Sequence, residues 1–243
     1  MSDIVKVEGL SKSYQGRRVV DSLSFCVKKG HVLGLLGANG AGKSTSMECI
    51  LGTKKRDKGQ VSIYGMDPLF ERKRVFERVG VQFQDSCYQR EIRVEELCEE
   101  TKGLYSKTMD YRQLLKRFGI LEKSKNQVKD LSGGERQRLF IVLALIAKPE
   151  LVFLDELTTG LDASARREVW RILLGLKEAG ITMLLTSHFM DEVEILCDEI
   201  LILKKGITVY HGSVQEAINN SPYEKLEDAY LWYAHEKEEE GFE

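Results

Sequence analysis

The fold is decided by the stretch Gly37-Ala38-Asn39-Gly40-Ala41-Gly42-Lys43-Ser44-Thr45. It matches the phosphate-binding pattern G-x-x-x-x-G-K-[ST], between an apolar run predicted as a strand (residues 32–36) and a segment compatible with a helix (residues 44–51). Glycines let the backbone turn its N–H groups inward around an anion, and the start of the following helix adds the positive end of a dipole. The stretch therefore predicts a phosphate-binding loop.

Two side chains of this loop have predicted roles of their own. Lys43 would reach the β- and γ-phosphates of a nucleotide, and the hydroxyl of Ser44 would ligate Mg2+. The remaining residues expected to contact the phosphates are Gly37, Asn39, Gly40, Ala41, Gly42 and Thr45. The alternative, a glycine-rich turn without a ligand, is disfavoured by the strand and the helix on either side.

Composition limits the class of protein. With 36 basic and 38 acidic residues the net charge is −2, so no overall field attracts nucleic acid. The longest apolar run, residues 139–147, is too short to span a bilayer, and the N-terminus does not resemble a signal peptide, so we expect a soluble cytoplasmic chain. The cysteines form no C-x-x-C pair and are expected to be reduced and mostly buried. They are Cys26, Cys49, Cys87, Cys98 and Cys197.

The order of patterns along the chain predicts a single α/β domain. Residues 1–84 and 127–220 alternate strands and helices as a parallel-sheet core does, with a β-rich start in residues 3–36. Residues 85–126 are acidic, helix-prone and poor in β-branched residues, which indicates an inserted helical subdomain. Residues 221–243 are expected to form a helix that docks on the body through Leu226, Ala229, Tyr230 and Tyr233, followed by an acidic tail.

A second glycine-rich turn occurs at Leu131-Ser132-Gly133-Gly134-Glu135. Ser132 and Glu135 form an S-x-x-E capping box, which predicts a helix start by itself. A cap does not require two adjacent glycines. We therefore expect Gly133 and Gly134 to leave the helix start bare, so that it can approach a second phosphate face.

Acidic residues follow the next buried strand. The run 151–154 leads into Asp155 and Glu156 at the carboxyl edge of the predicted sheet, where ligands bind in open α/β folds. Carboxylates repel phosphates unless a Mg2+ ion lies between them. Asp155 would be a partner of that metal, and Glu156 would orient or activate water. Two solvated acids at the start of a loop are the alternative.

Three further residues have both a structural and a functional interpretation. His188, after the strand predicted at 181–186, is either structural or a donor to a γ-phosphate oxygen. Asp162 either caps the helix that begins near residue 163 or belongs to the site. Gln84 ends another strand, where its amide could sense Mg2+ or water, and Gln82 on the same strand face ranks second.

Taken together, these residues resemble the nucleotide-binding subunit of ATP-binding cassette (ABC) transporters over nearly the whole chain. The resemblance implies a P-loop NTPase (RecA-like) parallel-sheet core with an antiparallel β subdomain and an inserted α-helical subdomain. It implies that the cofactors are ATP and Mg2+. The residues that look most like the branch exporting drugs, polyketides or peptides are the run 158–162, Arg166, Arg167, Glu192 and the run 226–228.

The same resemblance implies roles for individual residues. Tyr14 would stack on adenine, and Gln84 would ligate Mg2+ and couple the metal to a membrane partner. Glu156 would be the catalytic base and His188 the γ-phosphate switch. Ser132, Gly133 and Gly134 would contact the γ-phosphate of ATP held by another subunit, and Asp162 would lie in the loop between subunits.

The implied partners are a second copy or a homologous ATPase subunit and an integral membrane transport subunit, at the inner face of the cell membrane. Two positions depart from the family pattern: Leu157 replaces a common proline, and His31 replaces an acidic residue, which we expect to be a surface change. The open alternative is a soluble ABC ATPase of the DNA-repair, translation or Fe–S assembly type. A P-loop GTPase or small-molecule kinase would leave the second glycine turn unexplained.

Overall fold

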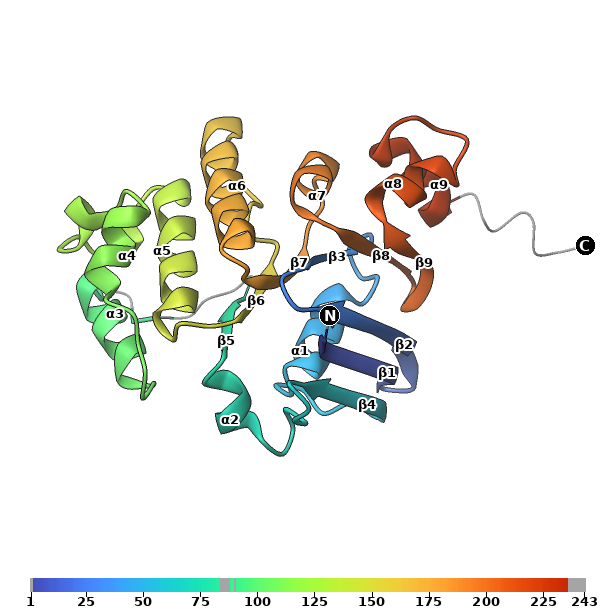
Figure 1. Ribbon diagram of the computed structural model, residues 1–243, viewed down its shortest axis with the longest axis horizontal. Helices are drawn as coiled ribbons and strands as arrows, with labels where there is room; N and C mark the ends of the chain where they lie inside the picture. The colour runs from blue at the N-terminus through green and yellow to red at the C-terminus, as the bar shows by residue number, and fades with distance from the viewer. Residues whose placement is uncertain (1, 84–87, 90, 236–243) are drawn as a thin grey trace, which may run out of the picture. The chain divides into compact units, whose positions relative to one another are not determined.

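The computed structural model describes residues 2–83, 88–89 and 91–235 (Figure 1). The chain divides into two compact units, one drawn from Met1–Arg72 and Leu184–Glu243 and the other from Lys73–Met183. Strand β7 (Thr182–Thr186) contains the point where the units divide. Within the described residues no helix has the length and apolarity needed to cross a membrane. The predicted bounds of the helical subdomain stay a prediction.

The first unit begins with a three-stranded antiparallel sheet in the order β2-β1-β4. Buried and exposed residues alternate along much of β2, as expected for strands with one face on the core. The register places Val7 opposite Phe25 and Tyr14 opposite Arg17. The sheet's strands and the helix that contacts it are β1 (Asp3–Tyr14), β2 (Arg17–Lys28), β4 (Lys58–Ile63) and α1 (Lys43–Ile50).

A parallel pair completes the core of this unit. Strand β3 (Val32–Leu36) is buried at all five residues and pairs in parallel with β8 (Glu199–Lys204), which pairs antiparallel with β9 (Ile207–Ser213). Continuous burial is typical of a parallel strand covered on both faces. The remaining helices of the unit are α7 (Met190–Leu196), α8 (Val214–Asn219) and α9 (Leu226–His235).

Three of the four residues through which we expected the C-terminal helix to dock are buried, and the fourth, Tyr230, is half-buried. Leu226 and Ala229 of α9 are fully buried and Tyr233 is 3% exposed. In Figure 1, α9 lies beside α8, which it contacts. The acidic tail that we expected after α9 lies outside the described residues.

The second unit joins a parallel pair of strands to helices. Strand β5 (Val79–Gln82) pairs in parallel with the fully buried β6 (Leu151–Asp155). Helix α5 (Gly133–Ile146) contacts α3, α4, α6 and β5, and Figure 1 shows it beside α3 and α4. The other helices are α2 (Arg72–Phe76), α3 (Val94–Gly103), α4 (Tyr111–Arg117), α6 (Ala163–Glu178) and the 3₁₀ turns η1 (Leu121–Lys123) and η2 (Val128–Asp130).

The cysteines and His31 are only partly placed as predicted. Of the described cysteines, Cys49, Cys98 and Cys197 are buried and Cys26 is exposed, while Cys87 lies outside the described residues. His31, expected to be a surface change, is half-buried instead. Its Nδ1 atom is buried and has no hydrogen-bond partner among the residues that the structure describes.

Candidate active site

The predicted phosphate-binding loop joins β3 to α1 in the first unit. Gly37 and Gly42 have φ angles of 153° and 106°, in the region that favours glycine. A Cβ atom on Gly37 would lie 2.6 Å from the carbonyl oxygen of Leu203, and one on Gly42 would lie 2.6 Å from that of Val19. Both glycines are therefore required by conformation and by close backbone packing.

At the start of the helix that follows the loop, no side chain of the helix competes with an anion for the backbone N–H groups. Gly42 is the N-cap of α1, no side chain caps the helix, and its first turn holds no acidic residue. The positive end of the helix dipole therefore faces the loop unopposed, which favours the binding of an anion. Ser44 and Thr45, in the first turn of α1, are half-buried.

Lys43 is the charged group of the loop. Its side chain is 4% exposed, and its ammonium donates to the carbonyl oxygens of Gly37 at 2.8 Å and Ala38 at 3.3 Å. The charge therefore lies against the backbone that would surround a phosphate. A triphosphate would offer this ammonium stronger, charge-assisted hydrogen bonds than neutral carbonyls do.

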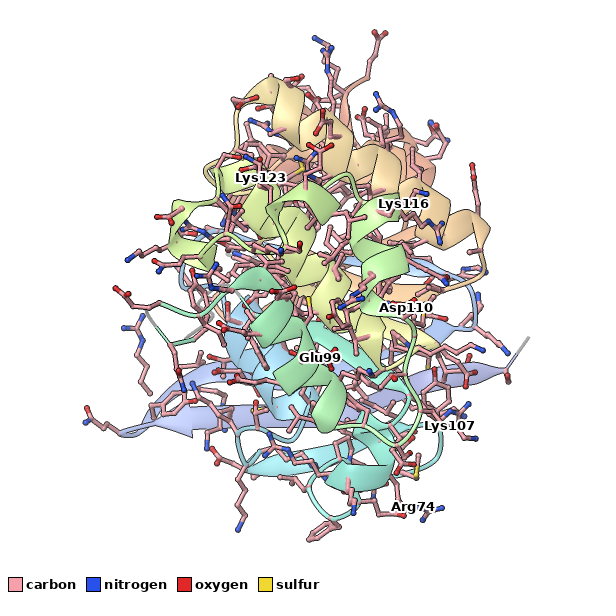
Figure 2. The ribbon with its side chains drawn as sticks, turned by 90° about the vertical axis from the view of Figure 1, so that its left-hand side faces the viewer. Arg74, Glu99, Lys107, Asp110, Lys116 and Lys123 are labelled. Carbon is pink, nitrogen blue, oxygen red and sulfur yellow. The ribbon has the colours of Figure 1, made fainter. Side chains whose placement is uncertain are left out.

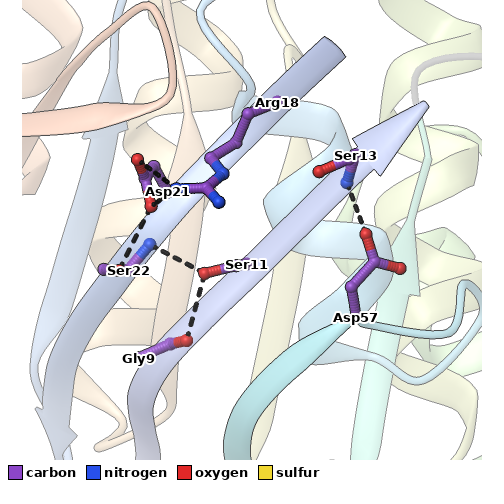
Figure 3. Close-up of polar contacts among 7 residues, drawn as sticks. All are labelled: Gly9, Ser11, Ser13, Arg18, Asp21, Ser22 and Asp57. Carbon is purple, nitrogen blue, oxygen red and sulfur yellow. Dashed lines mark hydrogen bonds and ion pairs between the residues drawn. The ribbon is translucent and has the colours of Figure 1, made fainter. Parts of the chain in front are cut away.

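Tyr14 is the last residue of β1, directly before the turn at residues 15–16. Its side chain is 41% exposed, and Lys12 and Lys54 place their ammonium nitrogens 5.2 Å and 5.8 Å from the ring centroid. Asp57 holds this strand end, because it accepts a hydrogen bond from Lys12 at 3.0 Å. It also accepts from the backbone N–H of Ser13 at 2.7 Å, as Figure 3 shows. The bond from Lys12 is the main reason that the pKa of Asp57 is lowered. The sequence did not suggest this support for Tyr14.

His188 follows β7 in the first unit and is exposed. The turn that carries it is built on Ser187, which is buried. The Ser187 hydroxyl bonds the carboxylate of Glu192, and it accepts from the backbone N–H of Phe189 at 3.0 Å. We had not assigned Ser187 a role, although a buried serine at a strand end is a recognisable turn signal.

In the second unit, Asp155 ends β6 and is 4% exposed. Its backbone N–H donates to Oε1 of Gln82 at 3.2 Å, and Nε2 of Gln82 donates to the carbonyl oxygen of Phe83 at 2.6 Å. Gln82, which we ranked second, thus positions the end of β6. Gln84, which we ranked first, lies outside the described residues.

Glu156 has a φ angle of 50°, in a region that residues other than glycine adopt infrequently. Such conformations cost free energy and cluster at functional sites, where surrounding structure maintains them. The following turn is held by the N–H of Thr159, which donates to the Glu156 carbonyl oxygen at 3.1 Å, and by the buried Leu157. Leu157, one of the two departures from the family pattern, therefore anchors this turn.

The second glycine turn has the predicted capping box. The N–H of Glu135 donates to Oγ of Ser132 at 3.3 Å, and the N–H of Ser132 donates to Oε2 of Glu135 at 2.9 Å. The helix begins at Gly133, directly after the capping residue Ser132. A Cβ atom on Gly134 would lie only 3.0 Å from Cβ of Ala165, so this glycine also permits close packing against α6.

Asp162 caps α6, as one of our two interpretations predicted. Its Oδ1 accepts from the N–H groups of Ser164 and Ala165, each at 2.9 Å. Leu161 lies next to the glycine turn, because a Cβ atom on Gly133 would be 3.4 Å from its Cδ2. The glycine turn and the start of α6 are therefore neighbours in one unit.

The predicted site residues fall into two groups. The first unit holds Tyr14, the loop from Gly37 to Thr45, and His188. The second unit holds Ser132, Gly133, Gly134, Asp155, Glu156 and Asp162. Among the described residues, no group of three or more histidine, cysteine, aspartate or glutamate side chains could hold a metal ion. The hydroxyl of Ser44 and the carboxylate of Asp155 are nevertheless each an oxygen donor of the kind that Mg2+ prefers.

The chain is similar to known proteins of one family. Residues 20–159 match the family model described as ABC transporter. The chain is similar to Nod factor export ATP-binding protein I of Ralstonia nicotianae, at 39% identity over 89% of this chain and 69% of that protein. It is 38% identical to the protein of the same name from Sinorhizobium fredii, over 87% of this chain and 63% of that protein. Linearmycin resistance ATP-binding protein LnrL of Bacillus subtilis is 33% identical over 86% of this chain and 69% of its own length.

Solved structures are similar in fold. One described as the ATP binding subunit of an ABC transporter has a TM-score of 0.85 and 24% identity, and covers 95% of this chain and 99% of that chain. A nucleotide-free ATP-binding cassette from an ABC transporter has a TM-score of 0.80 and 23% identity, over 91% of this chain and 96% of that one. These likenesses confirm the predicted α/β fold of the P-loop NTPase type.

Proposed function

The chain belongs to the ABC transporter family, and on that premise we propose that it drives export through a separate membrane subunit by binding and hydrolysing ATP. The observation that carries the proposal is the presence of two glycine-lined helix starts in one chain, at Gly42 and at Gly133. A GTPase or a small kinase needs only the first. The names of the relatives, which refer to export and to resistance, favour a transporter over a soluble ATPase.

Nucleotide binding is assigned to the first unit and to the end of β6. The loop from Gly37 to Thr45 would surround the phosphates. Lys43 would exchange its hydrogen bonds to the loop carbonyls for hydrogen bonds to the β- and γ-phosphates. Ser44 and Asp155 would hold Mg2+, with Gln84 as a further ligand, and the ion would neutralise charge on the phosphate oxygens. Tyr14, supported by Lys12, would stack on adenine.

Hydrolysis is assigned to residues at the strand ends. Glu156 would orient and deprotonate the water that attacks the γ-phosphorus, giving ADP and phosphate. His188 would donate a hydrogen bond to a γ-phosphate oxygen. The positive φ angle of Glu156 supports this assignment, because backbone strain is maintained where a side chain must be aimed.

The second glycine turn requires a second copy of the chain or a homologous subunit. Ser132, Gly133 and Gly134 would contact the γ-phosphate of ATP held by that other copy, and Asp162 would lie at the contact between the two. The capping box supports this role, because Oγ of Ser132 accepts from the backbone and can still donate its own hydrogen to a phosphate. Two copies would thus enclose two ATP molecules and reopen after hydrolysis.

The membrane partner and the direction of transport are also part of the proposal. Gln84 would couple the nucleotide to an integral membrane subunit, which would hold the complex at the inner face of the cell membrane. Co-purification with a membrane protein from detergent-solubilised membranes tests this arrangement. A chain that is recovered only from the soluble fraction of its own cells would contradict it.

The substitution Glu156→Gln tests the catalytic assignment. We expect the variant to bind ATP with unchanged affinity while its hydrolysis rate falls by about 10²-fold or more, since general-base catalysis contributes about that much. Glu178→Gln, at the exposed end of α6, removes the same charge and should hydrolyse ATP normally. Hydrolysis at the wild-type rate by the Glu156 variant would refute the assignment.

A further inference from the structure

Glu135 places a negative charge at the start of α5, where we propose that a triphosphate binds. Its Oε2 accepts from the backbone N–H of Ser132 at 2.9 Å, within the capping box. This bond is the largest of the effects that lower the pKa of Glu135 below its ordinary value. The carboxylate is therefore ionised at neutral pH and partly cancels the positive end of the helix.

The two proposed phosphate-binding helix starts differ in this respect. Helix α1 has no side-chain cap and no acidic residue in its first turn, whereas α5 has both. The capping box favours folding, but its carboxylate repels an anion that approaches the same backbone. A helix start that serves both purposes needs a compensating positive charge.

Lys123 supplies such a charge. It ends the 3₁₀ turn η1, and its Nζ lies 3.3 Å from Oε1 of Glu135. The two carboxylate oxygens thus have separate partners, with Oε2 on the backbone of Ser132 and Oε1 on the ammonium. In Figure 2, Lys123 lies well away from the labelled acidic residues Glu99 and Asp110, which bond elsewhere: Glu99 to Lys102, and Asp110 to the N-terminus of α4.

We propose that Lys123 is a positioning residue for ATP, which neutralises Glu135 so that the glycine turn can accept the γ-phosphate of a nucleotide held by a second copy. This inference rests on the proposed function of the turn. If the pair served folding alone, its loss would have little effect on stability. The Lys123 and Glu135 side chains are 43% and 20% exposed, and surface ion pairs contribute little to stability. The positive charge of Lys123 is instead needed when the triphosphate binds at the glycine turn.

The test uses the full chain carrying Glu156→Gln, with dimer formation measured by light scattering as MgATP is added. Lys123→Met should raise the ATP concentration needed for half-maximal dimer by about three- to tenfold, as expected for one partly exposed charge at a helix start. Lys123→Arg should behave as the parent. Adding Glu135→Gln to Lys123→Met should restore the parent value to within about twofold, because no charge then needs compensation.

A matched control removes a different ion pair of the same unit. Lys129 lies 3.0 Å from Glu91, so Lys129→Met loses the same charge and a similar contact, and its dimer formation should match the parent. Binding of a fluorescent ATP analogue to monomers should be unchanged in every variant, and thermal melting should be unchanged in the variants that replace Lys123 or Lys129 alone. These two measurements exclude a general loss of folding as the cause.

The outcomes separate the inference from the function on which it rests. Ser132→Arg places a bulky side chain in the turn and should prevent dimer formation. If that variant dimerises as the parent does, the proposed function itself fails. If Ser132→Arg blocks dimers but Lys123→Met has no effect, or its effect persists with Glu135→Gln, then the inference about Lys123 alone is overturned.

Discussion

Replacing Gln82 with leucine should disturb the end of β6 and, through it, the proposed catalytic carboxylates. Gln82 is 3% exposed, and its side chain provides the acceptor for the N–H of the equally buried Asp155. Leucine has a similar size but no acceptor, and a buried donor left unpaired costs about 1–3 kcal/mol. At about 2–4 °C per kcal/mol for a chain of this size, a 2 kcal/mol loss lowers Tm by about 4–8 °C.

The effect on hydrolysis should be larger than the effect on stability. A shift of about 1 Å in a catalytic group can cost about 10²-fold in rate, so we expect ATP turnover to fall by one to two orders of magnitude in Gln82→Leu. Thermal melting and a phosphate-release assay measure the two effects. Gln60→Leu, on the exposed part of β4, is the control and should change stability by less than about 0.5 kcal/mol. A Gln82 variant with wild-type melting and turnover would refute this role of the hydrogen bond.

Four further predictions follow from the coordinates. Gly42→Ala should abolish binding of a fluorescent ATP analogue, because the new Cβ would meet the carbonyl oxygen of Val19 at 2.6 Å; binding at wild-type affinity would contradict the described loop. Asp162→Ala should lower Tm by about 2–4 °C, as expected for the loss of a cap worth about 1 kcal/mol. Tyr14→Ala should weaken ATP binding by about 1–3 kcal/mol while Tyr14→Trp does not, measured by titration calorimetry. The pKa of Glu135 is lowered in the folded chain, so the ionised carboxylate stabilises the fold above the unfolded pKa near 4.5. This stabilisation is lost as the pH falls through the folded pKa. The difference in the free energy of unfolding between wild type and Glu135→Gln, measured in urea, should therefore shrink below about pH 4.5.

Local signals predicted much of the fold. The bounds of β3 were predicted to the residue, and those of α1 and β7 to within one residue. The capping box at Ser132 and the cap at Asp162 were also predicted, since a cap depends on residues two or three positions apart. Signals of this kind are readable because the interacting groups are neighbours in the sequence.

Contacts between distant segments were not predicted. Gln82 ranked below Gln84 because nothing in the sequence shows that its side chain reaches the N–H of Asp155, 73 positions later. The packing of Gly134 on Ala165 was missed for the same reason. We explained this glycine by phosphate access alone, whereas the close approach of two helices also requires it.

The central claim is that two glycine-lined helix starts, on different copies of the chain, bind one ATP between them. A structure of the Glu156→Gln variant with MgATP tests it most directly. We predict a closed dimer in which Gly133 and Gly134 of one copy lie within hydrogen-bond distance of the γ-phosphate bound at Lys43 of the other. A closed, nucleotide-bound dimer with these glycines far from every γ-phosphate would contradict the claim.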